Sequence, residues 1–141
     1  MKRTDLGAAS VELAILAPVM LLVIGLLIVG GRVALASDAI TGVAGVAARD
    51  GSLARTPAEA REIAISSADR ELAAQGLQCV GSPQVDVDVS GFAAPPGTPA
   101  VVTVQITCRV RLSDVGLPGL PGTKELRDHG ASPIDPYRGA P

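Results

Sequence analysis

The chain has 141 residues and a formal net charge of -2 at pH 7. About 110 residues follow a long apolar run near the N-terminus, which leaves room for one small domain. The chain has one Tyr, one Phe, no Trp and no basic cluster. It therefore lacks the cationic and aromatic surfaces that nucleic-acid-binding proteins use, so nucleic acid is not an expected partner.

An apolar run without a charged side chain extends from Leu13 to Gly31. As an α-helix it would be about 28 Å long, close to the roughly 30 Å hydrocarbon core of a bilayer. The remainder of the chain is too small and too polar to bury such a helix on every side. The run therefore predicts a single membrane-spanning helix, with the lipid bilayer as its partner.

Two residues distinguish this helix from a generic anchor. Pro18 lies inside the run and predicts a kink over residues 14–18. Glu12 stands at its entrance. A carboxylate at the bilayer centre would cost about 2.5–3.5 kcal/mol, and a carboxylate in or beside the hydrocarbon is usually retained for a specific partner. The alternative is that Glu12 lies in the headgroup zone, where the cost is small.

The first six residues carry Lys2 and Arg3, which favours a cytoplasmic N-terminus and an extracytoplasmic remainder. A positive start before an apolar run also occurs in secretory signals, and residues 34–36 offer a small-residue cleavage pattern. The run is longer than the apolar region of such a signal. We therefore expect an anchor that stays attached, with a cleaved signal as the alternative.

The helical pattern continues from Arg32 to Arg49 and ends at residues 50–52. An apolar stripe at helical spacing predicts an extension of the same helix into water, formed by Val33, Ala36, Ile40, Val43, Ala44 and Ala47. Small residues along this stretch would let another helix approach closely: Gly30, Ala34, Gly42, Ala44, Gly45 and Ala48. The alternative is a loosely packed stalk.

A second helix is predicted from Thr56 as N-cap, Pro57 at the first position and Glu59 at the third, ending at Gly76. Its buried stripe is expected to contain Ile65, Ala68 and Leu72, flanked by Ile63, Ala64 and Ala73.

Alternation of apolar and polar residues then predicts two strands, over residues 84–90 and 102–112, paired as an antiparallel hairpin. Asp86 and Asp88 share the wet face of the first strand, and we expect them to pair with Arg109 and Arg111 of the second. Paired acids also occur in glycosidases and calcium sites, which is the less economical interpretation. Residues 123–131 either add a third strand or stay irregular, and His129 is expected on an exposed loop.

Cys79 and Cys108 are 29 residues apart and share the parity of the apolar faces of the two strands. Two thiols and one histidine do not make a zinc site. In an extracytoplasmic domain the pair predicts a disulfide, whereas in a cytosolic domain two separate buried thiols would be expected.

The stretch from Gly7 to Glu12, GAASVE, followed by LAILAPVMLLV, resembles the N-terminal segment of TadE-like pilus-assembly proteins, pseudopilins of the tight-adherence (Tad/Flp) machinery. The shared pattern is small residues, then Val-Glu, then an apolar run with proline, matched by Ala8, Ala9, Val11, Glu12 and Pro18. The tail from Ser132 to Arg138 is similar to the ending of actinobacterial members. From Ser37 to Ala131 the resemblance is architectural.

The resemblance implies that a prepilin peptidase cuts between Gly7 and Ala8. Glu12 then becomes the fifth residue of the mature chain, the position at which pilin-like subunits carry a glutamate. In an assembly this carboxylate would pair with the new amine of a neighbouring subunit. Glu12 and Pro18 are therefore the expected assembly residues.

We expect an α+β, pilin-like protein with a leader (1–7), a transmembrane helix with an aqueous extension (8–50, spanning at 13–31), an extracytoplasmic domain (51–131) and an extended tail (132–141). The domain would hold one further helix and an antiparallel hairpin or small sheet.

The expected function is that of a minor pseudopilin-like subunit or membrane assembly factor of a Tad-type pilus at the cell membrane, without a cofactor. Its partners would be other pilin-like subunits, the Tad machinery and a prepilin peptidase. The alternative is an anchored protein that binds an extracellular partner through the hairpin at residues 85–112. An enzyme is not expected, because the sequence offers no nucleophile with a base and no metal cluster.

Overall fold

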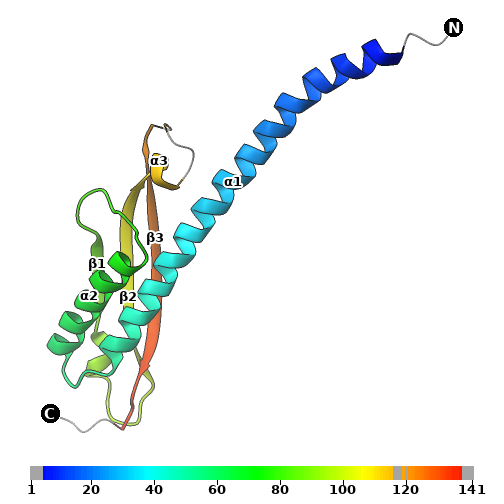
Figure 1. Ribbon diagram of the computed structural model, residues 1–141. Helices are drawn as coiled ribbons and strands as arrows, with labels where there is room; N and C mark the ends of the chain where they lie inside the picture. The colour runs from blue at the N-terminus through cyan, green and yellow to red at the C-terminus, as the bar shows by residue number, and fades with distance from the viewer. Residues whose placement is uncertain (1–4, 116–118, 120, 138–141) are drawn as a thin grey trace.

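The computed structural model describes residues 5–115, 119 and 121–137 of the chain, and Figure 1 shows its elements. It opens with a 48-residue helix, α1 (Asp5–Ser52), and a second helix, α2 (Pro57–Ala74). The strand β1 (Gln84–Asp88), the short 3-10 helix η1 (Ser90–Ala93) and the strand β2 (Ala100–Arg111) follow. A single helical turn, α3 (Leu112–Val115), leads to the last strand, β3 (Thr123–Ile134).

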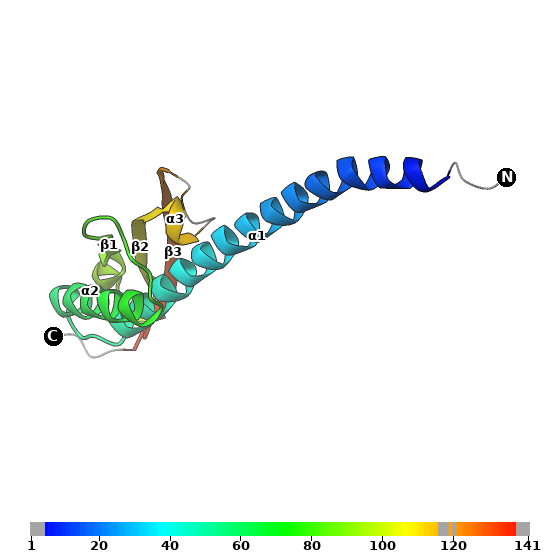
Figure 2. The ribbon, with the colours of Figure 1, turned by 45° about the horizontal axis from the view of Figure 1, so that its top comes forward.

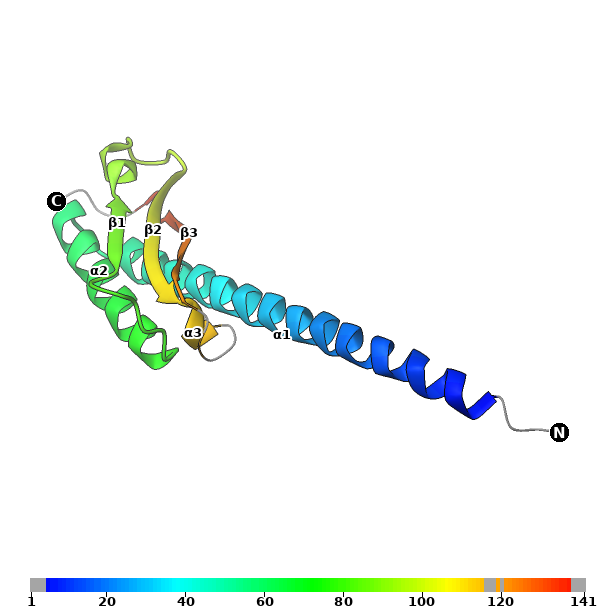
Figure 3. The same cartoon turned by 90° about the horizontal axis from the view of Figure 1, so that it is seen from above.

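The three strands form an antiparallel sheet in the order β1-β2-β3. The helix α2 and the C-terminal half of α1 cover one face of this sheet, as seen from above in Figure 3. The N-terminal half of α1 projects away from the domain. This arrangement confirms the predicted fold class: a long apolar N-terminal helix, one further helix and a small antiparallel sheet.

The helix α1 is continuous from the apolar run into the domain, as its periodicity predicts. The expected stripe faces the sheet, and all its residues but the half-buried Val33 are buried: Ala36, Ile40, Val43, Ala44 and Ala47. The small residues Ala44 and Ala48 are fully buried in the chain's own domain. The chain's own domain therefore covers Ala44 and Ala48, which belong to the small-residue surface on which the sequence predicted the approach of another helix.

The core between the layers is aliphatic. From Val102 on, alternate residues of β2 point into it and are buried: Val102, Val104, Ile106, Cys108 and Val110. Val87 of β1 and Leu126 and Ile134 of β3 complete the sheet side of the core. The alternation predicted from the sequence thus sets the inner face of both predicted strands.

The helix α2 begins and ends as its sequence predicts. The hydroxyl of Thr56 accepts a hydrogen bond from the backbone N–H of Glu59 at 3.2 Å, while the Glu59 carboxylate accepts one from the N–H of Arg55. At the other end Gly76 adopts φ of 66°. This left-handed residue lets the N–H of Leu77 reach the carbonyl of Leu72, which closes the helix.

The buried face of α2 matches the prediction at Ala64, Ala68 and Leu72, which are buried, and differs from it elsewhere. Ile65 is 37 % exposed and Ala73 is exposed, whereas Ala60 and Ser67 are buried. Small side chains face α1 here because the two helices lie close together, so the larger Ile65 lies outside the contact. Ser67 is tolerated because its hydroxyl donates to the Asp50 carboxylate at 2.5 Å.

The strand register contradicts the predicted charge pairs. Asp86 lies opposite Gln105, and Asp88 lies opposite Thr103. Arg109 instead lies opposite Glu125 of β3 and forms an ion pair with it at 3.3 Å. The prediction placed these side chains on the correct face of the sheet. It gave the wrong partners because a loop of ten residues or more between two strands leaves open which residues lie opposite each other.

The third strand exists and is as long as β2. It pairs with β2 over its whole length, from Thr123 opposite Arg111 to Ile134 opposite Ala100. The predicted tail therefore contributes its first three residues, 132–134, to the sheet. His129 lies on this strand instead of a loop, with its side chain exposed.

Candidate functional site

The projecting half of α1 is the candidate functional element. Twelve of its large apolar side chains are exposed, over the whole circumference of the helix: Leu13, Ile15, Leu16, Val19, Met20, Leu21, Leu22, Val23, Ile24, Leu26, Leu27 and Ile28. A helix with apolar side chains on all sides is stable in lipid but not in water.

Within the described residues, α1 is the one helix long and apolar enough to cross a membrane. None of the most apolar stretch is buried inside the domain, so this part of α1 is not packed as a core helix of a soluble protein would be. One apolar helix of this kind, near the N-terminus, suggests a single-pass membrane protein. Pro18 lies inside the helix without interrupting it, and Figure 2 shows the ribbon curving within its blue N-terminal stretch.

The predicted cleavage and assembly residues lie at the start of this helix. The backbone of Gly7, Ala8 and Glu12 is helical, and the side chains of residues 5–12 are outside the described part. The bond between Gly7 and Ala8 falls in the first turn, where the backbone N–H groups have no acceptor within the helix. Cleavage at this bond and the roles of Glu12 and Pro18 stay predictions.

Where α1 meets the domain, a glycine permits direct contact of the helix with β3. A Cβ atom added to Gly130 would lie 2.4 Å from the Ala44 carbonyl carbon and equally close to the Gly45 nitrogen. Only a residue without a side chain therefore allows this approach. Neither α1 nor β3 shows this requirement in its own sequence, because it arises where they cross.

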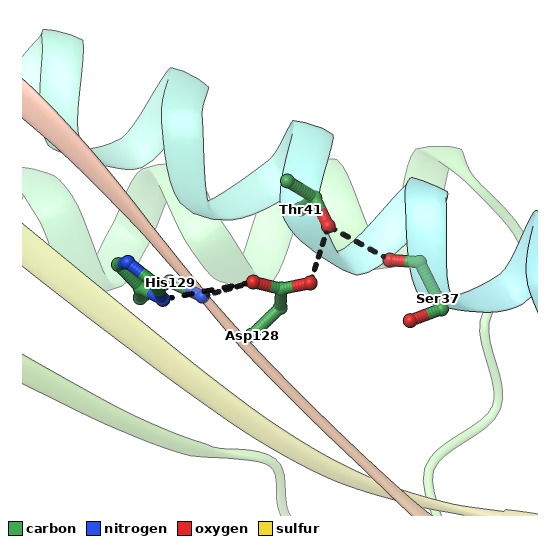
Figure 4. A network of polar contacts seen from close by, with 4 residues as sticks. All are labelled: Ser37, Thr41, Asp128 and His129. Atoms are coloured by element: carbon green, nitrogen blue, oxygen red, sulfur yellow. Dashed lines mark hydrogen bonds and ion pairs between the residues drawn. The ribbon is translucent and has the colours of Figure 1, made fainter.

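A polar contact also joins α1 to β3, as Figure 4 shows. The Thr41 hydroxyl lies 2.6 Å from Oδ2 of Asp128, to which it donates, and 3.1 Å from the carbonyl oxygen of Ser37. The other carboxylate oxygen of Asp128 accepts the backbone N–H of His129 at 2.8 Å. The His129 ring lies 3.7 Å from the same oxygen and adds an ion pair when it is protonated.

This contact shifts the ionisation of Asp128. The hydrogen bond from Thr41 is the main cause that lowers the pKa of its carboxyl, and the N–H of His129 adds to it, because both donors stabilise the carboxylate. The pKa of Asp88 is also lowered, mainly by the backbone N–H of Ser90. The sequence does not point to Thr41 or Asp128, since nothing local distinguishes them from other polar residues at the surface.

A disulfide between Cys79 and Cys108 joins the segment after α2 to the central strand, with the two Cα atoms 5.3 Å apart. The bridge confirms the predicted pairing. It anchors the long connection between α2 and β1 to the inner face of the sheet, beside the aliphatic core.

The described residues contain no group of three or more His, Cys, Asp or Glu side chains placed to hold a metal ion. Asp86 and Asp88 lie on the exposed face of β1.

The model of the TadE-like protein family matches residues 7–49. This segment covers the apolar run and nearly all of the part of α1 that packs on the sheet, whereas α2 and the sheet lie outside it. Neither the curated proteins nor the solved structures yield a significant match. Over residues 7–49 the chain is therefore similar to the TadE-like protein family, as the resemblance found in its sequence predicts, and this similarity suggests involvement in Tad pilus assembly.

Proposed function

We propose that this chain is a non-catalytic, minor pseudopilin-like subunit or membrane assembly factor of a Tad-type pilus. Residues 13–31 hold it in the cytoplasmic membrane, with the N-terminus inside and the domain outside. The observation that carries the proposal is the division of α1, whose TadE-like segment is unpacked and apolar in its first half and fixed to a folded domain in its second.

Rigid coupling between span and domain suits an assembly role. The close approach at Gly130 and the hydrogen bond between Thr41 and Asp128 fix the domain to α1 without a flexible linker. A subunit built in this way transmits the position of its membrane helix directly to the surface that it presents. A simple tether would not need this coupling.

Glu12 supplies the register of assembly in this proposal. Cleavage after Gly7 creates an amine at Ala8, and the Glu12 carboxylate of one subunit pairs with the amine of the next. At 4 Å and an effective dielectric constant of 20, such a pair attracts by about 4 kcal/mol before desolvation is counted. The pairing favours one docked arrangement over unordered association in the bilayer.

The absence of catalysis is part of the proposal. The sequence contains one histidine, His129, whose side chain is 72 % exposed. Both cysteines are joined in the disulfide. These residues offer no general base beside a nucleophile, and a non-catalytic role agrees with this composition.

Replacing Glu12 tests the assembly role. We expect Glu12→Ala to insert into membranes normally and to be lost from sheared pili or from cross-linked complexes with pilin-like subunits. Glu62→Ala, which removes an exposed carboxylate from α2, is the matched control and should assemble like the unchanged chain. If Glu12→Ala assembles equally well, the proposal is wrong.

Mass spectrometry of the mature N-terminus tests processing. A chain that begins at Ala8 supports cleavage by a prepilin peptidase. A chain that begins near Ser37 would show ordinary secretion and remove the membrane anchor. An intact Met1 would mean that the chain acts as an uncleaved membrane protein, without the amine that Glu12 needs.

A second candidate function is an anchored domain that binds an extracellular ligand. The outer face of the sheet favours it, because a shallow polar hollow there is lined by Gln84, Asp86, Gln105, Thr107, Glu125 and Arg127. This function would not require Glu12, so the same variant separates the two candidates.

A further inference from the structure

Several elements end together on the side of the domain from which α1 projects. The C-terminus of α2, the end of β2, the α3 turn and the start of β3 all lie there (Figure 1). The α3 turn also contacts α1. This end of the domain therefore faces the surface from which α1 emerges.

The contacts between α1 and β3 give the height of this end relative to the membrane. Thr41 meets Asp128, and Gly130 meets the backbone at Ala44, so the helix and the strand run in the same direction. Lys124 precedes Asp128 by about 13 Å along the strand. The same distance along a helix is about nine residues, which leads from Thr41 back to Arg32.

Lys124 thus lies at about the height of Arg32, the first charged residue after the span. Arg111 lies at the same end, since it pairs with Thr123, the neighbour of Lys124. All three side chains are exposed. We call Arg32, Arg111 and Lys124 the basic end of the domain.

The chain after the span is acidic as a whole, in contrast to the basic end. After Gly31 the sequence carries 10 Lys and Arg against 12 Asp and Glu. The basic end holds three of these cations. The acids nearest to it among the described residues are Asp114 of α3, Glu71 in the last turn of α2 and Glu125, which forms an ion pair with Arg109. A negatively charged surface would attract the basic end and repel the acidic remainder.

We propose that the basic end docks on the anionic phospholipid headgroups of the bilayer that α1 spans. Because α1 holds the domain at the membrane, docking needs no further loss of translational freedom, and a few cations are enough to bias the orientation. Docking fixes the tilt of the domain over the membrane before the chain meets its partners. The inference rests on the membrane insertion proposed above.

The absence of tryptophan from the chain allows a direct measurement of docking. Ser113→Trp places a single tryptophan on α3, and Thr98→Trp places one on an exposed loop at the far end of the sheet. The full chain is reconstituted into vesicles of phosphatidylcholine alone or of equal parts phosphatidylcholine and phosphatidylglycerol. A spin label on a fraction of the headgroups quenches a tryptophan that lies near them.

We expect strong quenching of Ser113→Trp in the anionic vesicles, with less in the neutral ones and at high salt, and little quenching of Thr98→Trp in either. Each Lys or Arg near an anionic surface changes the docked-to-undocked ratio roughly fivefold. Arg111→Glu with Lys124→Glu should therefore remove most of the quenching. Arg49→Glu with Arg55→Glu makes the same change of net charge away from this end and should leave the quenching unchanged.

Insertion of every variant is checked first by resistance to carbonate extraction. A chain that is extracted contradicts the proposed function itself. In an inserted chain, equal quenching of the two tryptophans would overturn the docking proposal alone. Quenching that ignores both lipid charge and the Arg111/Lys124 reversal would overturn it as well.

Discussion

Asp128 is the residue through which ionisation affects the attachment of α1 to β3. Its carboxylate accepts hydrogen bonds from Thr41 on the helix and from the N–H of His129 on its own strand. Both donors favour the charged form and lower the pKa of the carboxyl in the folded protein. The unfolded chain lacks these donors and therefore binds a proton more readily in acid.

This difference predicts an acid-sensitive stability. The contribution of Asp128 is complete above the ordinary pKa of 3.8 and is lost as the pH falls through the lower value of the folded state. Asp128→Asn should therefore flatten the decline of the free energy of unfolding below about pH 4, as measured by urea denaturation across pH.

Asp88→Asn is the comparison for this measurement, because the pKa of Asp88 is lowered by a local bond to Ser90 instead of a contact with α1. Each variant should remove part of the acid sensitivity. Protease cleavage at the contact between α1 and β3 should lose its dependence on pH in Asp128→Asn and keep it in Asp88→Asn. An unchanged pH profile in Asp128→Asn would contradict the role of this contact.

At the scale of elements, the crossing of α1 over β3 decides how the domain is held. The backbone of α1 at Ala44 and Gly45 leaves no room for a side chain at position 130. The surrounding residues of α1, Ile40, Val43 and Ala47, are buried in the core. A displacement of the helix at this crossing would therefore disturb the whole contact between the two layers.

Gly130→Ala should lower the free energy of unfolding by about 1–3 kcal/mol, because the added methyl group forces the helix and strand apart. Gly42→Ala is the matched control on α1, since a Cβ there meets nothing within 4 Å. This change should stabilise the helix by about 0.5–1 kcal/mol. Urea denaturation of the detergent-solubilised chain measures both, and equal stability of the two variants would refute the packing argument.

At the scale of the whole molecule, the disulfide links stability to the side of the membrane on which the domain folds. The bridge joins residues 29 apart in sequence, and closing a loop of this size contributes about 3–4 kcal/mol in the chain-entropy model. Disulfides form outside the cytoplasm and are rare within it. An extracytoplasmic domain is therefore expected to carry the bridge in the cell.

Alkylation of membranes before and after reduction measures this state. We expect two modifiable thiols after reduction only, and a lower urea midpoint for the variant Cys79→Ala with Cys108→Ala. Reductant should lower the midpoint of the unchanged chain and leave that of the variant as it is. Free thiols in unreduced membranes would argue against the proposed orientation.

The sequence alone determined the features that repeat at short range. The apolar run predicted the projecting helix, a period of 3.6 gave its buried stripe after Val33, and a period of two gave the inner faces of β1 and β2. The parity of Cys108 placed its thiol toward the core, whereas Cys79 lies in an irregular segment before β1, where strand parity does not apply. The cap at Thr56 and the stop at Gly76 fixed the ends of α2. Each of these signals depends on residues a few positions apart.

The tertiary structure decided everything that depends on two distant segments meeting. It set the register that separates Asp86 and Asp88 from the arginines, the full length of β3, and the rotation of α2 that leaves Ile65 exposed. It also brought Gly130 and Asp128 against α1. A strand with one polar face fits several registers nearly equally well by pattern alone. Close packing between the helices and the sheet selects one register, and this packing cannot be predicted from any short stretch of the sequence.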